Sequence, residues 1–313
     1  MVTDAGYALP TAVVARSIAN MQTPNIGPIY FVWIDDEAPP RELIGYLDKA
    51  GINLVTAQNS LLRTMKPAYA GYVTRASAAR LFLATLLEKF PVDKFLCLDG
   101  DIEVAGSLGA LAAIDLPHDH IAATGDYAPL LASSSQTTVM LRKRLRDLGM
   151  PENAPYFNSG VILGHMDSWH KISVEAQQVL LENIQACTYY EQCALNAVTY
   201  SRCLALSPKW NFQAPLFRLN VEADIKPGIV HFTGSHKPWG SVPLTRPWQA
   251  RGPFLAARAE LPQLWKRTAL RNSLRTSLPL FRKALKQYSK KPKANERSFF
   301  LDYMSSTRFV DEL

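Results

Sequence analysis

Two carboxylates directly follow a short apolar run in the middle of the chain. The run at 95–98 leads straight into Asp99-Gly100-Asp101, so two acids lie two positions apart at the end of an expected strand. In open α/β sheets, ligands bind at this end of the strands. Two carboxylates so close repel each other unless a cation joins them, and hard oxygen ligands favour Mg²⁺ or Mn²⁺. The pattern suggests a metal that binds a phosphorylated substrate, although an isolated pair of this kind is more often a solvated turn.

A second group of polar residues follows a late apolar run at 229–233. It offers His231 as a third metal ligand, Gly234 for close approach of the backbone to a ligand, and Lys237 as a charge for phosphate. An imidazole beside two carboxylates suits Mn²⁺ better than Ca²⁺. The plain alternative is a core histidine and a surface lysine.

Two further polar pairs have the residue types that bind sugar hydroxyls. Asn158 and Ser159 come just ahead of an expected buried strand at 161–163, and Glu191 and Gln192 begin an expected helix. Acids and amides at such edges also serve as helix caps and turn residues.

The elements that must position these residues alternate along the first 260 residues. Strand-like runs separated by helix-period segments are typical of a mainly parallel α/β sheet. The expected strands are 29–34, 52–57, 94–98, 121–124, 161–163 and 229–233, and the expected helices are 41–50, 75–90, 174–186 and 192–200.

Charge divides the chain unevenly. The net charge is +7, but the stretch 261–293 has ten basic residues and no acid, so residues 1–260 are close to neutral. We therefore expect a globular domain at 1–260 and a basic amphipathic extension at 261–313. Within it, apolar residues recur every three or four positions from Leu270 to Tyr288, with a kink or restart at Pro279. Such a segment can bind an anionic membrane surface, and in this chain residues 264–293 would make that contact. The alternative is a solvated helix that packs on the globular domain through its leucines.

Other classes of protein fit less well. No run reaches the roughly 20 apolar residues of a membrane span, and the first residues do not form a secretory signal. The four cysteines include no CxxC pair, which favours reduced thiols in a cytosolic protein. A nucleic acid partner is not expected, because the basic extension lacks the aromatic spacing of a single-strand platform.

Taken together, the polar groups resemble glycosyltransferase family 8, the family of glycogenin and of bacterial lipopolysaccharide galactosyl- and glucosyltransferases. The resemblance covers roughly residues 2–240. It rests on segments that occur in the family's order, namely Val2-Thr3-Asp4-Ala5-Gly6-Tyr7, Ser77-Ala78-Ala79-Arg80-Leu81, Leu98-Asp99-Gly100-Asp101, Tyr156-Phe157-Asn158-Ser159-Gly160, Glu191-Gln192-Cys193-Ala194-Leu195-Asn196 and His231-Phe232-Thr233-Gly234 with Lys237-Pro238-Trp239.

The resemblance implies a GT-A type nucleotide-diphospho-sugar transferase fold, with a Rossmann-like mixed but mainly parallel sheet. It also implies a UDP-sugar donor, Mn²⁺ (or Mg²⁺) and retention at the anomeric carbon. The implied roles follow the motifs. The metal would be held by Asp99, Asp101 and His231, and the nucleotide by Asp4, Tyr7, Arg80, Gly100, Gly234 and Lys237. The transferred hexose would be surrounded by Asp126, Asn158, Ser159, Glu191 and Gln192.

Several positions depart from the family pattern. Cys193 replaces an acid, Gly6 replaces a polar side chain, and Gly100 predicts a more flexible metal loop than the usual Ala, Ser or Thr. Only three residues precede Asp4, whereas the first strand of the family is usually longer. We therefore expect that this sequence starts later than the natural protein does.

The sequence thus predicts a retaining hexosyltransferase that moves galactose or glucose from a UDP-sugar to a lipopolysaccharide core or another surface glycan or glycolipid. Its expected place is the cytoplasm, peripherally attached to the inner face of the membrane. The alternative is a catalytically inactive, membrane-tethered protein that binds a nucleotide sugar.

Overall fold

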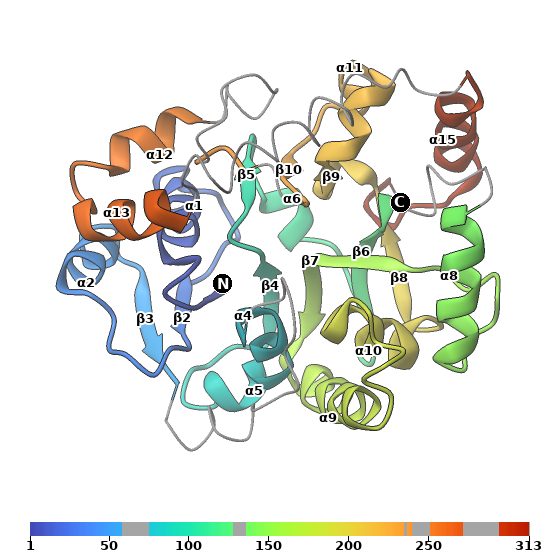
Figure 1. Cartoon of the computed structure of the whole chain (residues 1–313), viewed down its shortest axis with the longest axis horizontal. Helices are drawn as coiled ribbons and strands as arrows, with labels where there is room; N and C mark the ends of the chain where they lie inside the picture. The colour runs from blue at the N-terminus through green and yellow to red at the C-terminus, as the bar shows by residue number, and fades with distance from the viewer. Residues whose placement is uncertain (58–74, 128–135, 235–236, 240–250, 272–293, 313) are drawn as a thin grey trace.

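The computed structural model describes residues 1–57, 75–127, 136–234, 237–239, 251–271 and 294–312. Within them, strands form three small sheets in the middle of the molecule, and helices lie around them (Figure 1). The expected mixed α/β architecture is confirmed. Much of the basic extension, 272–293, lies outside the described residues.

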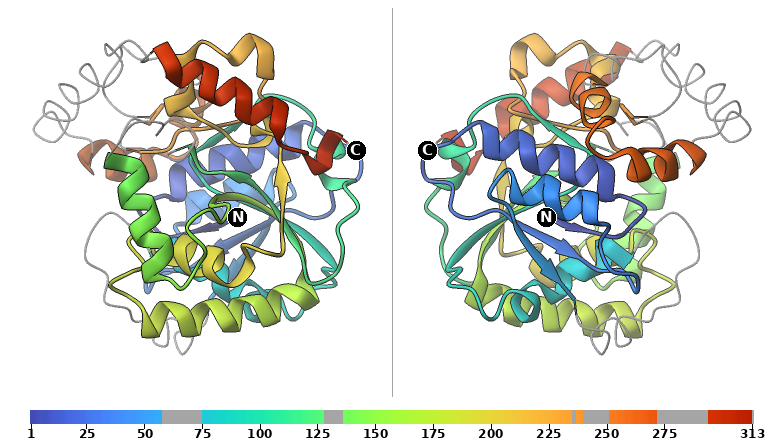
Figure 2. Two further views of the ribbon diagram at one scale, coloured as in Figure 1. Left: turned by 90° about the vertical axis from the view of Figure 1, so that its right-hand side faces the viewer. Right: turned by 90° about the vertical axis from the view of Figure 1, so that its left-hand side faces the viewer.

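The first sheet is parallel and contains the N-terminal strands. Its order is β1 (Val2–Thr3), β2 (Tyr30–Trp33) and β3 (Asn53–Thr56). The connecting helices are α1 (Ala8–Asn20) and α2 (Arg41–Asp48). Both pack on one face of the sheet, where they cover Phe31 and Trp33 (Figure 2). A polar turn at 4–7 thereby lies at the carboxyl end of β1, where a nucleotide-binding fold presents its ligand side chains.

The second sheet is mixed. Its order is β4 (Lys94–Leu98), β7 (Phe157–His165), β6 (Ile121–Gly125) and β8 (Cys203–Leu206). The strand β7 is antiparallel to both of its neighbours, whereas β6 and β8 are parallel. Helices α9 (Met166–Glu182) and α10 (Tyr190–Thr199) pack against each other beside this sheet.

The third sheet brings together the two segments predicted to bind metal, the acidic loop at 99–101 and the strand that ends at His231. Strand β10 (Ile229–His231) lies between β5 (Ile102–Val104) and β9 (Phe212–Gln213). It runs antiparallel to β5, and His231 is opposite Ile102 in the register. Because Ile102 follows Asp101 directly, this pairing brings His231 beside the acidic loop although 130 residues separate them in the chain.

Helix α1 was not among the expected helices, and α9 begins eight residues before the expected 174. Two further differences from the sequence prediction concern elements that hold predicted site residues. The expected helix 75–90 is broken into α4 (Arg75–Ala79), the 3₁₀ turn η1 (Arg80–Phe82) and α5 (Leu83–Leu86). The backbone carbonyls of Arg80 and Leu81 accept hydrogen bonds from Trp169 Nε1 and Gln177 Nε2 of α9, so tertiary contacts replace continuous helix bonding. The other difference is β7, which begins at Phe157 and therefore contains Asn158 and Ser159 rather than following them.

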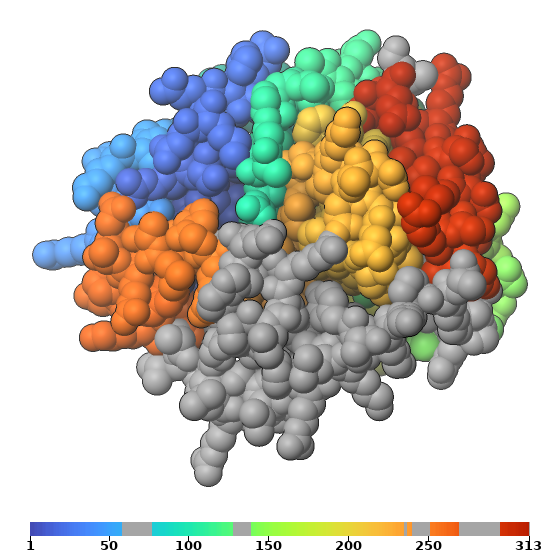
Figure 3. Space-filling model, turned by 90° about the horizontal axis from the view of Figure 1, so that it is seen from above, coloured from blue at the N-terminus to red at the C-terminus, as the bar shows by residue number. Residues whose placement is uncertain are grey.

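The described parts of the C-terminal segment pack on the body. Helices α12 (Gly252–Ala257) and α13 (Pro262–Arg271) lie beside α1 and α2, and Leu261 and Leu264 are buried there (Figure 3). Glu42 of α2 accepts the backbone N–H groups of Gln263 and Leu264, at 3.1 and 2.7 Å, and so caps α13.

At the other side of the molecule, α15 (Ala294–Ser306) buries Phe300 and lies across the sheets from α9 (Figure 2). The remaining short elements are α6 (Gly109–Ala112), α8 (Gln136–Asp147), η2 (Pro208–Trp210), η3 (Ala214–Leu219), α11 (Glu222–Ile225) and η5 (Val310–Glu312). None of the helices within the described ranges combines the length and the hydrophobicity needed to span a bilayer.

Candidate active site and metal centre

The two acids and the histidine predicted as metal ligands lie together. The Nε2 atom of His231 is 3.3 Å from Asp101 Oδ1 and 3.7 Å from Asp99 Oδ2. One potential ligand atom from each residue falls within 4.8 Å of the others. Ligands that share a small divalent ion at about 2.1 Å are separated by about 3.0 to 4.2 Å. The cluster therefore fits Mg²⁺ or Mn²⁺ with little movement, and its imidazole favours Mn²⁺.

A glycine leaves the space for the metal-site imidazole. A Cβ at Gly160 of β7 would lie 2.3 Å from His231 Cε1 and 2.6 Å from Nδ1, so no other residue fits there without displacing the ring. The amide of Asp99 donates to the carbonyl of Gly160 at 2.9 Å, which ties the acidic loop to the same strand.

Two cations neutralise the acidic loop. Arg80 Nη2 is 2.5 Å from Asp99 Oδ1, and Lys237 Nζ makes a short contact with Asp101 Oδ2. Burial by itself disfavours the charged form of Arg80, but Asp99 and Glu191 outweigh it and raise the pKa of the guanidinium. Burial likewise opposes ionisation of Asp101, and Lys237 and His231 outweigh it, so the pKa of this carboxyl is well below its usual range. The pair Lys237–Asp101 is thus fully charged at neutral pH.

The residues predicted to surround the hexose are also brought together. Gln192 Oε1 accepts Asn158 Nδ2 at 3.2 Å and Ser159 N at 3.1 Å, and Gln192 Nε2 donates to Asp126 Oδ2 at 3.1 Å. Asp126 directly follows β6, the pair 158–159 belongs to β7, and Gln192 belongs to α10. Three elements therefore converge on one buried polar cluster, and both ends of the Gln192 amide bind protein groups.

Glu191 joins this cluster to the cations. Its Oε1 atom is 3.5 Å from Arg80 Nε and 3.4 Å from Ser159 Oγ, and its side chain is buried. Burial raises the pKa of Glu191, and Arg80 opposes that shift. Arg80 therefore connects the metal loop at Asp99 with the predicted sugar pocket at Glu191.

The structure changes the interpretation of Cys193. Its sulfur contacts the hydroxyl of Tyr156 at 3.1 Å and accepts Tyr189 N at 3.2 Å, within the hydrophobic core. Cys193 therefore belongs to the core beside the polar cluster.

The predicted nucleotide residues surround the same loop. Asp4 Oδ1 accepts the amides of Gly6 and Tyr7 at 2.8 and 3.1 Å, which forms the turn before α1. The Tyr7 ring packs edge-on against Trp239 at 5.8 Å, and Lys237 Nζ lies 6.0 Å from the same ring. Gly234 has φ +83°, a conformation that strains other residues. The turn at 4–7 and the segment 237–239 thus lie close together, although they come from the two ends of the region that resembles the family.

Sequence reasoning missed Asn211. This residue is fully buried, and it lies between Asn158 and His231. The sequence offers only a weak indication of this residue, because a single amide side chain stands between two aromatic residues in Trp210-Asn211-Phe212.

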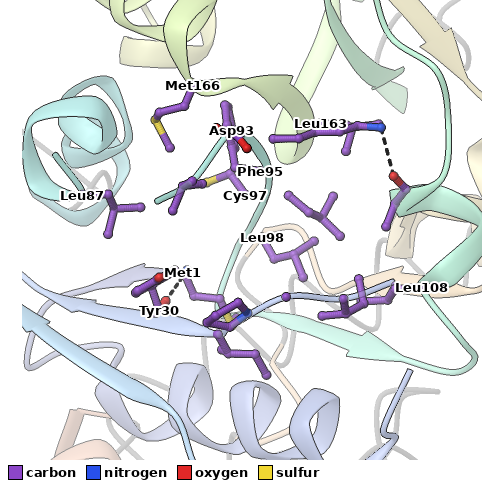
Figure 4. A pocket seen from close by; sticks show the side chains of 18 of the residues that line it. Met1, Tyr30, Leu87, Asp93, Phe95, Cys97, Leu98, Leu108, Leu163 and Met166 are labelled. Carbon is purple, nitrogen blue, oxygen red and sulfur yellow. Dashed lines mark hydrogen bonds between the residues drawn. The ribbon is translucent and has the colours of Figure 1, made fainter. Parts of the chain in front are cut away.

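A separate cavity of about 420 Å³ lies between the first two sheets (Figure 4). Its walls include Met1, Tyr30, Leu87, Phe95 and Met166, and it contains none of the predicted site residues. The amino group of Met1 donates to the carbonyl of Tyr30 at 2.9 Å beside it. An apolar lining of this kind does not suit a charged nucleotide.

The fold and the Asp–Asp–His cluster together define a GT-A type glycosyltransferase, a class that uses a nucleotide-sugar donor and a divalent metal. Residues 1–242 match the family model Glycosyl transferase family 8. The chain belongs to this family.

Known relatives share part of their length with this chain. A lipopolysaccharide 1,3-galactosyltransferase of Salmonella typhimurium is 28% identical over an alignment of 227 positions, and the match covers 67% of this chain and 61% of that protein. General stress protein A of Bacillus subtilis is 24% identical over an alignment of 186 positions, and the match covers 54% of this chain and 61% of that protein. The matches thus span about three fifths of these relatives.

Solved structures show the same fold. The galactosyltransferase LgtC, in complex with donor and acceptor sugar analogues, aligns with a TM-score of 0.65 at 20% identity, over 83% of this chain and 98% of that chain. The glycosyltransferase GlyE of Streptococcus pneumoniae aligns with a TM-score of 0.54 at 20% identity, over 84% of this chain and 61% of that chain.

Proposed function

We propose that this protein transfers a hexose, galactose or glucose, from a UDP-sugar to a glycan acceptor with retention of the anomeric configuration. The observation that carries the proposal is the Asp99–Asp101–His231 cluster, with Arg80 and Lys237 in contact with it, in a member of glycosyltransferase family 8. Such a cluster suits the diphosphate of a nucleotide donor.

The nucleotide is held by residues on both sides of the acidic loop. Asp4 and Tyr7 line the uridine site, and Gly234 and Lys237 contact the diphosphate, with Gly100 between the two acids. The metal, when bound by Asp99, Asp101 and His231, supplies Lewis-acid stabilisation of the charge that develops on UDP. Lys237 adds a second positive charge at the same leaving group, and its pKa is raised because Asp101 outweighs the effect of burial.

The acidic character of the sugar pocket supports a neutral hexose. Glu191 and Asp126 both belong to it, and Arg80 is already paired with Asp99 and Glu191. The carboxylate of a uronic acid would meet like charges there, whereas carboxylate oxygens accept hydroxyl hydrogen bonds well.

The position of Gln192 supports a front-face route, in which the departing phosphate removes the proton of the acceptor. An amide is a poor nucleophile, and both ends of this one are engaged by protein groups. Trapping of a glycosyl adduct on Glu191 or Asp126 would contradict this route.

The first test is release of UDP from a panel of UDP-sugars, with and without Mn²⁺, in the wild type, in Asp101→Ala and in Asp48→Ala as an exposed control. We expect one neutral UDP-hexose to turn over with metal, and Asp101→Ala to lose about a hundredfold or more of that activity. Asp48→Ala should retain it. Absence of UDP binding would contradict the assignment of the site. Binding of UDP with metal but no turnover with any sugar, even with glycan acceptors, would instead favour the inactive nucleotide-sugar-binding protein.

We further propose that the acceptor is a lipopolysaccharide core or another surface glycan or glycolipid, met in the cytoplasm at the inner face of the membrane. The relative from Salmonella, named as a lipopolysaccharide galactosyltransferase, supports the acceptor class. The excess of basic residues at 264–293 supports the anionic surface. Flotation with anionic and neutral vesicles tests this, and equal binding to both would contradict it.

A further inference from the structure

The buried network behind the metal cluster has a fixed direction of hydrogen bonding. It starts at the backbone amide of Gly160, which donates to Asn158 Oδ1 at 3.0 Å. A peptide N–H is only a donor, so Asn158 must present its oxygen at this point. Asn211 Nδ2 donates to the same oxygen at 2.9 Å. The orientation of the Asn211 amide is therefore set by a backbone group that cannot rotate.

The orientation of the Asn211 amide determines which of its atoms faces the Nδ1 atom of His231. With its nitrogen directed at Asn158, Asn211 places Oδ1 2.9 Å from His231 Nδ1. An oxygen at this distance requires a proton on Nδ1. The other ring nitrogen, Nε2, then has a free lone pair when the imidazole is neutral, and it is the atom that lies 3.3 Å from Asp101.

We propose that Asn211 is a positioning residue that keeps His231 in the tautomer whose Nε2 binds the divalent metal. This inference rests on the proposed metal site. An imidazole coordinates a metal only through a nitrogen that carries no proton, so a proton on Nε2 would block coordination. Asn211 accepts a hydrogen bond from Nδ1–H and so keeps the proton on that atom, and its complete burial leaves no access for water to take over this role.

The test compares Asn211→Leu with Asn211→Asp. Leucine has a similar size and removes the acceptor. Aspartate retains an acceptor for Nδ1, and in its protonated form it also retains a donor for Asn158. We expect Asn211→Leu to weaken Mn²⁺ binding about 10- to 100-fold, measured by titration calorimetry of the metal alone and with UDP. Asn211→Asp should bind Mn²⁺ nearly as well as the wild type.

Asn196→Leu is the matched control for loss of a fully buried amide. Asn196 binds the backbone of Phe157, at 2.8 Å to its N–H and 2.9 Å to its carbonyl, so its loss should destabilise the fold and leave metal affinity unchanged. Thermal unfolding identifies any variant that fails to fold, and Asn211→Ala then replaces Asn211→Leu.

A spectroscopic signature separates positioning from packing. In metal-free protein at mildly alkaline pH, the ¹⁵N shifts of the His231 ring, assigned with His231→Gln, should report a proton on Nδ1 in the wild type and on Nε2 in Asn211→Leu. Equal Mn²⁺ affinity in wild type and Asn211→Leu, or equal losses in the Leu and Asp variants, would overturn the role of Asn211 alone. Failure of the wild type to bind Mn²⁺ even with UDP would overturn the proposed metal site itself.

Discussion

A Cβ atom at Gly100 would lie 2.1 Å from Thr11 Oγ1 and 3.2 Å from Thr11 Cα. The residue between the two metal-site acids therefore packs directly on helix α1. The hydroxyl of Thr11 also donates to the carbonyl of Tyr7 at 2.8 Å, so α1 connects the acidic loop with the predicted uridine site. Glycine here serves a close approach to α1, because the residue is buried and a Cβ would collide with Thr11. The greater flexibility of the metal loop stays a prediction.

The first prediction follows from this contact. Gly100→Ala forces Thr11 or the loop to move, and overpacking of this kind costs about 1–3 kcal/mol of stability. We expect weaker Mn²⁺ binding as well, because Asp99 and Asp101 flank the displaced residue. Thr11→Ala should recover part of both losses in the double mutant, since the closest atom, Oγ1, is removed while the contacts with Cβ at 3.0 Å and Cα at 3.2 Å remain. Unfolding titrations and calorimetry measure the coupling, and strictly additive losses would contradict direct contact.

The second prediction concerns competition between Lys237 and a metal for Asp101. In Lys237→Met the charged Asp101 loses its closest partner in a site with little solvent, which costs about 3 kcal/mol in the metal-free protein. A divalent ion replaces the missing charge, so Mn²⁺ should raise the unfolding midpoint more in the mutant than in the wild type. Binding of UDP should be weaker.

Lys143→Met is the matched control, because Lys143 forms an exposed pair with Asp147. Its effect on stability should stay below about 0.5 kcal/mol. An equal shift by Mn²⁺ in Lys237→Met and in the wild type would show that lysine and metal do not share the carboxylate.

Sequence reasoning identified most of the site because its residues follow short apolar runs, and strand ends converge in this class of fold. It offered His231 as a third ligand beside Asp99 and Asp101 from residue type and strand position, and the family resemblance supported this set. The register itself was not predicted, since the pairing of β5 with β10 joins segments 130 residues apart. No local pattern encodes that register.

The errors also have physical causes. Asn158 and Ser159 were expected ahead of a strand because they are polar, yet β7 contains both, and their partners Asp126, just after β6, and Gln192 of α10 satisfy them in the interior. Asn211 has only a weak local signal, since its partners lie 53 and 20 residues away. Buried polar networks are specified by tertiary contacts, which periodicity does not report.

The third prediction concerns the pH dependence of stability. Burial raises the pKa of Glu191 above its ordinary value of 4.5, so ionisation of this carboxyl is less favourable in the folded than in the unfolded state. The corresponding stability is complete below the ordinary pKa and is lost as the pH rises through the folded value. Glu191→Gln lacks this ionisation, so we expect the variant to be more stable than the wild type at neutral pH, with a difference that shrinks toward pH 4.5. Urea unfolding across this range measures it.

Hexose transfer should fall in the same variant, because an amide accepts sugar hydroxyl hydrogen bonds less strongly than a carboxylate. A stability difference that does not vary with pH would show that Glu191 is ionised equally in the folded and unfolded states.

The fourth prediction is that the C-terminus stabilises the catalytic body, although it lies beyond the residues that match the family model. Asp311 accepts Ser207 N at 2.8 Å and Trp210 Nε1 at 2.9 Å, and its carboxylate is also 2.9 Å from Lys209 Nζ. Its side chain is only 4% exposed. Asp311→Ala leaves two buried donors without an acceptor, which costs about 2–3 kcal/mol.

Asp311→Asn retains one acceptor oxygen and should lose less stability, whereas Asp302→Ala, an exposed acid on α15, should have little effect. Trp210 immediately precedes Asn211, the residue that contacts His231, and Ser207 lies four residues before it. If Asp311 holds this segment in place, Asp311→Ala should also weaken Mn²⁺ binding in protein that remains folded. Unchanged stability and unchanged Mn²⁺ affinity in Asp311→Ala would show that the C-terminus contributes to neither.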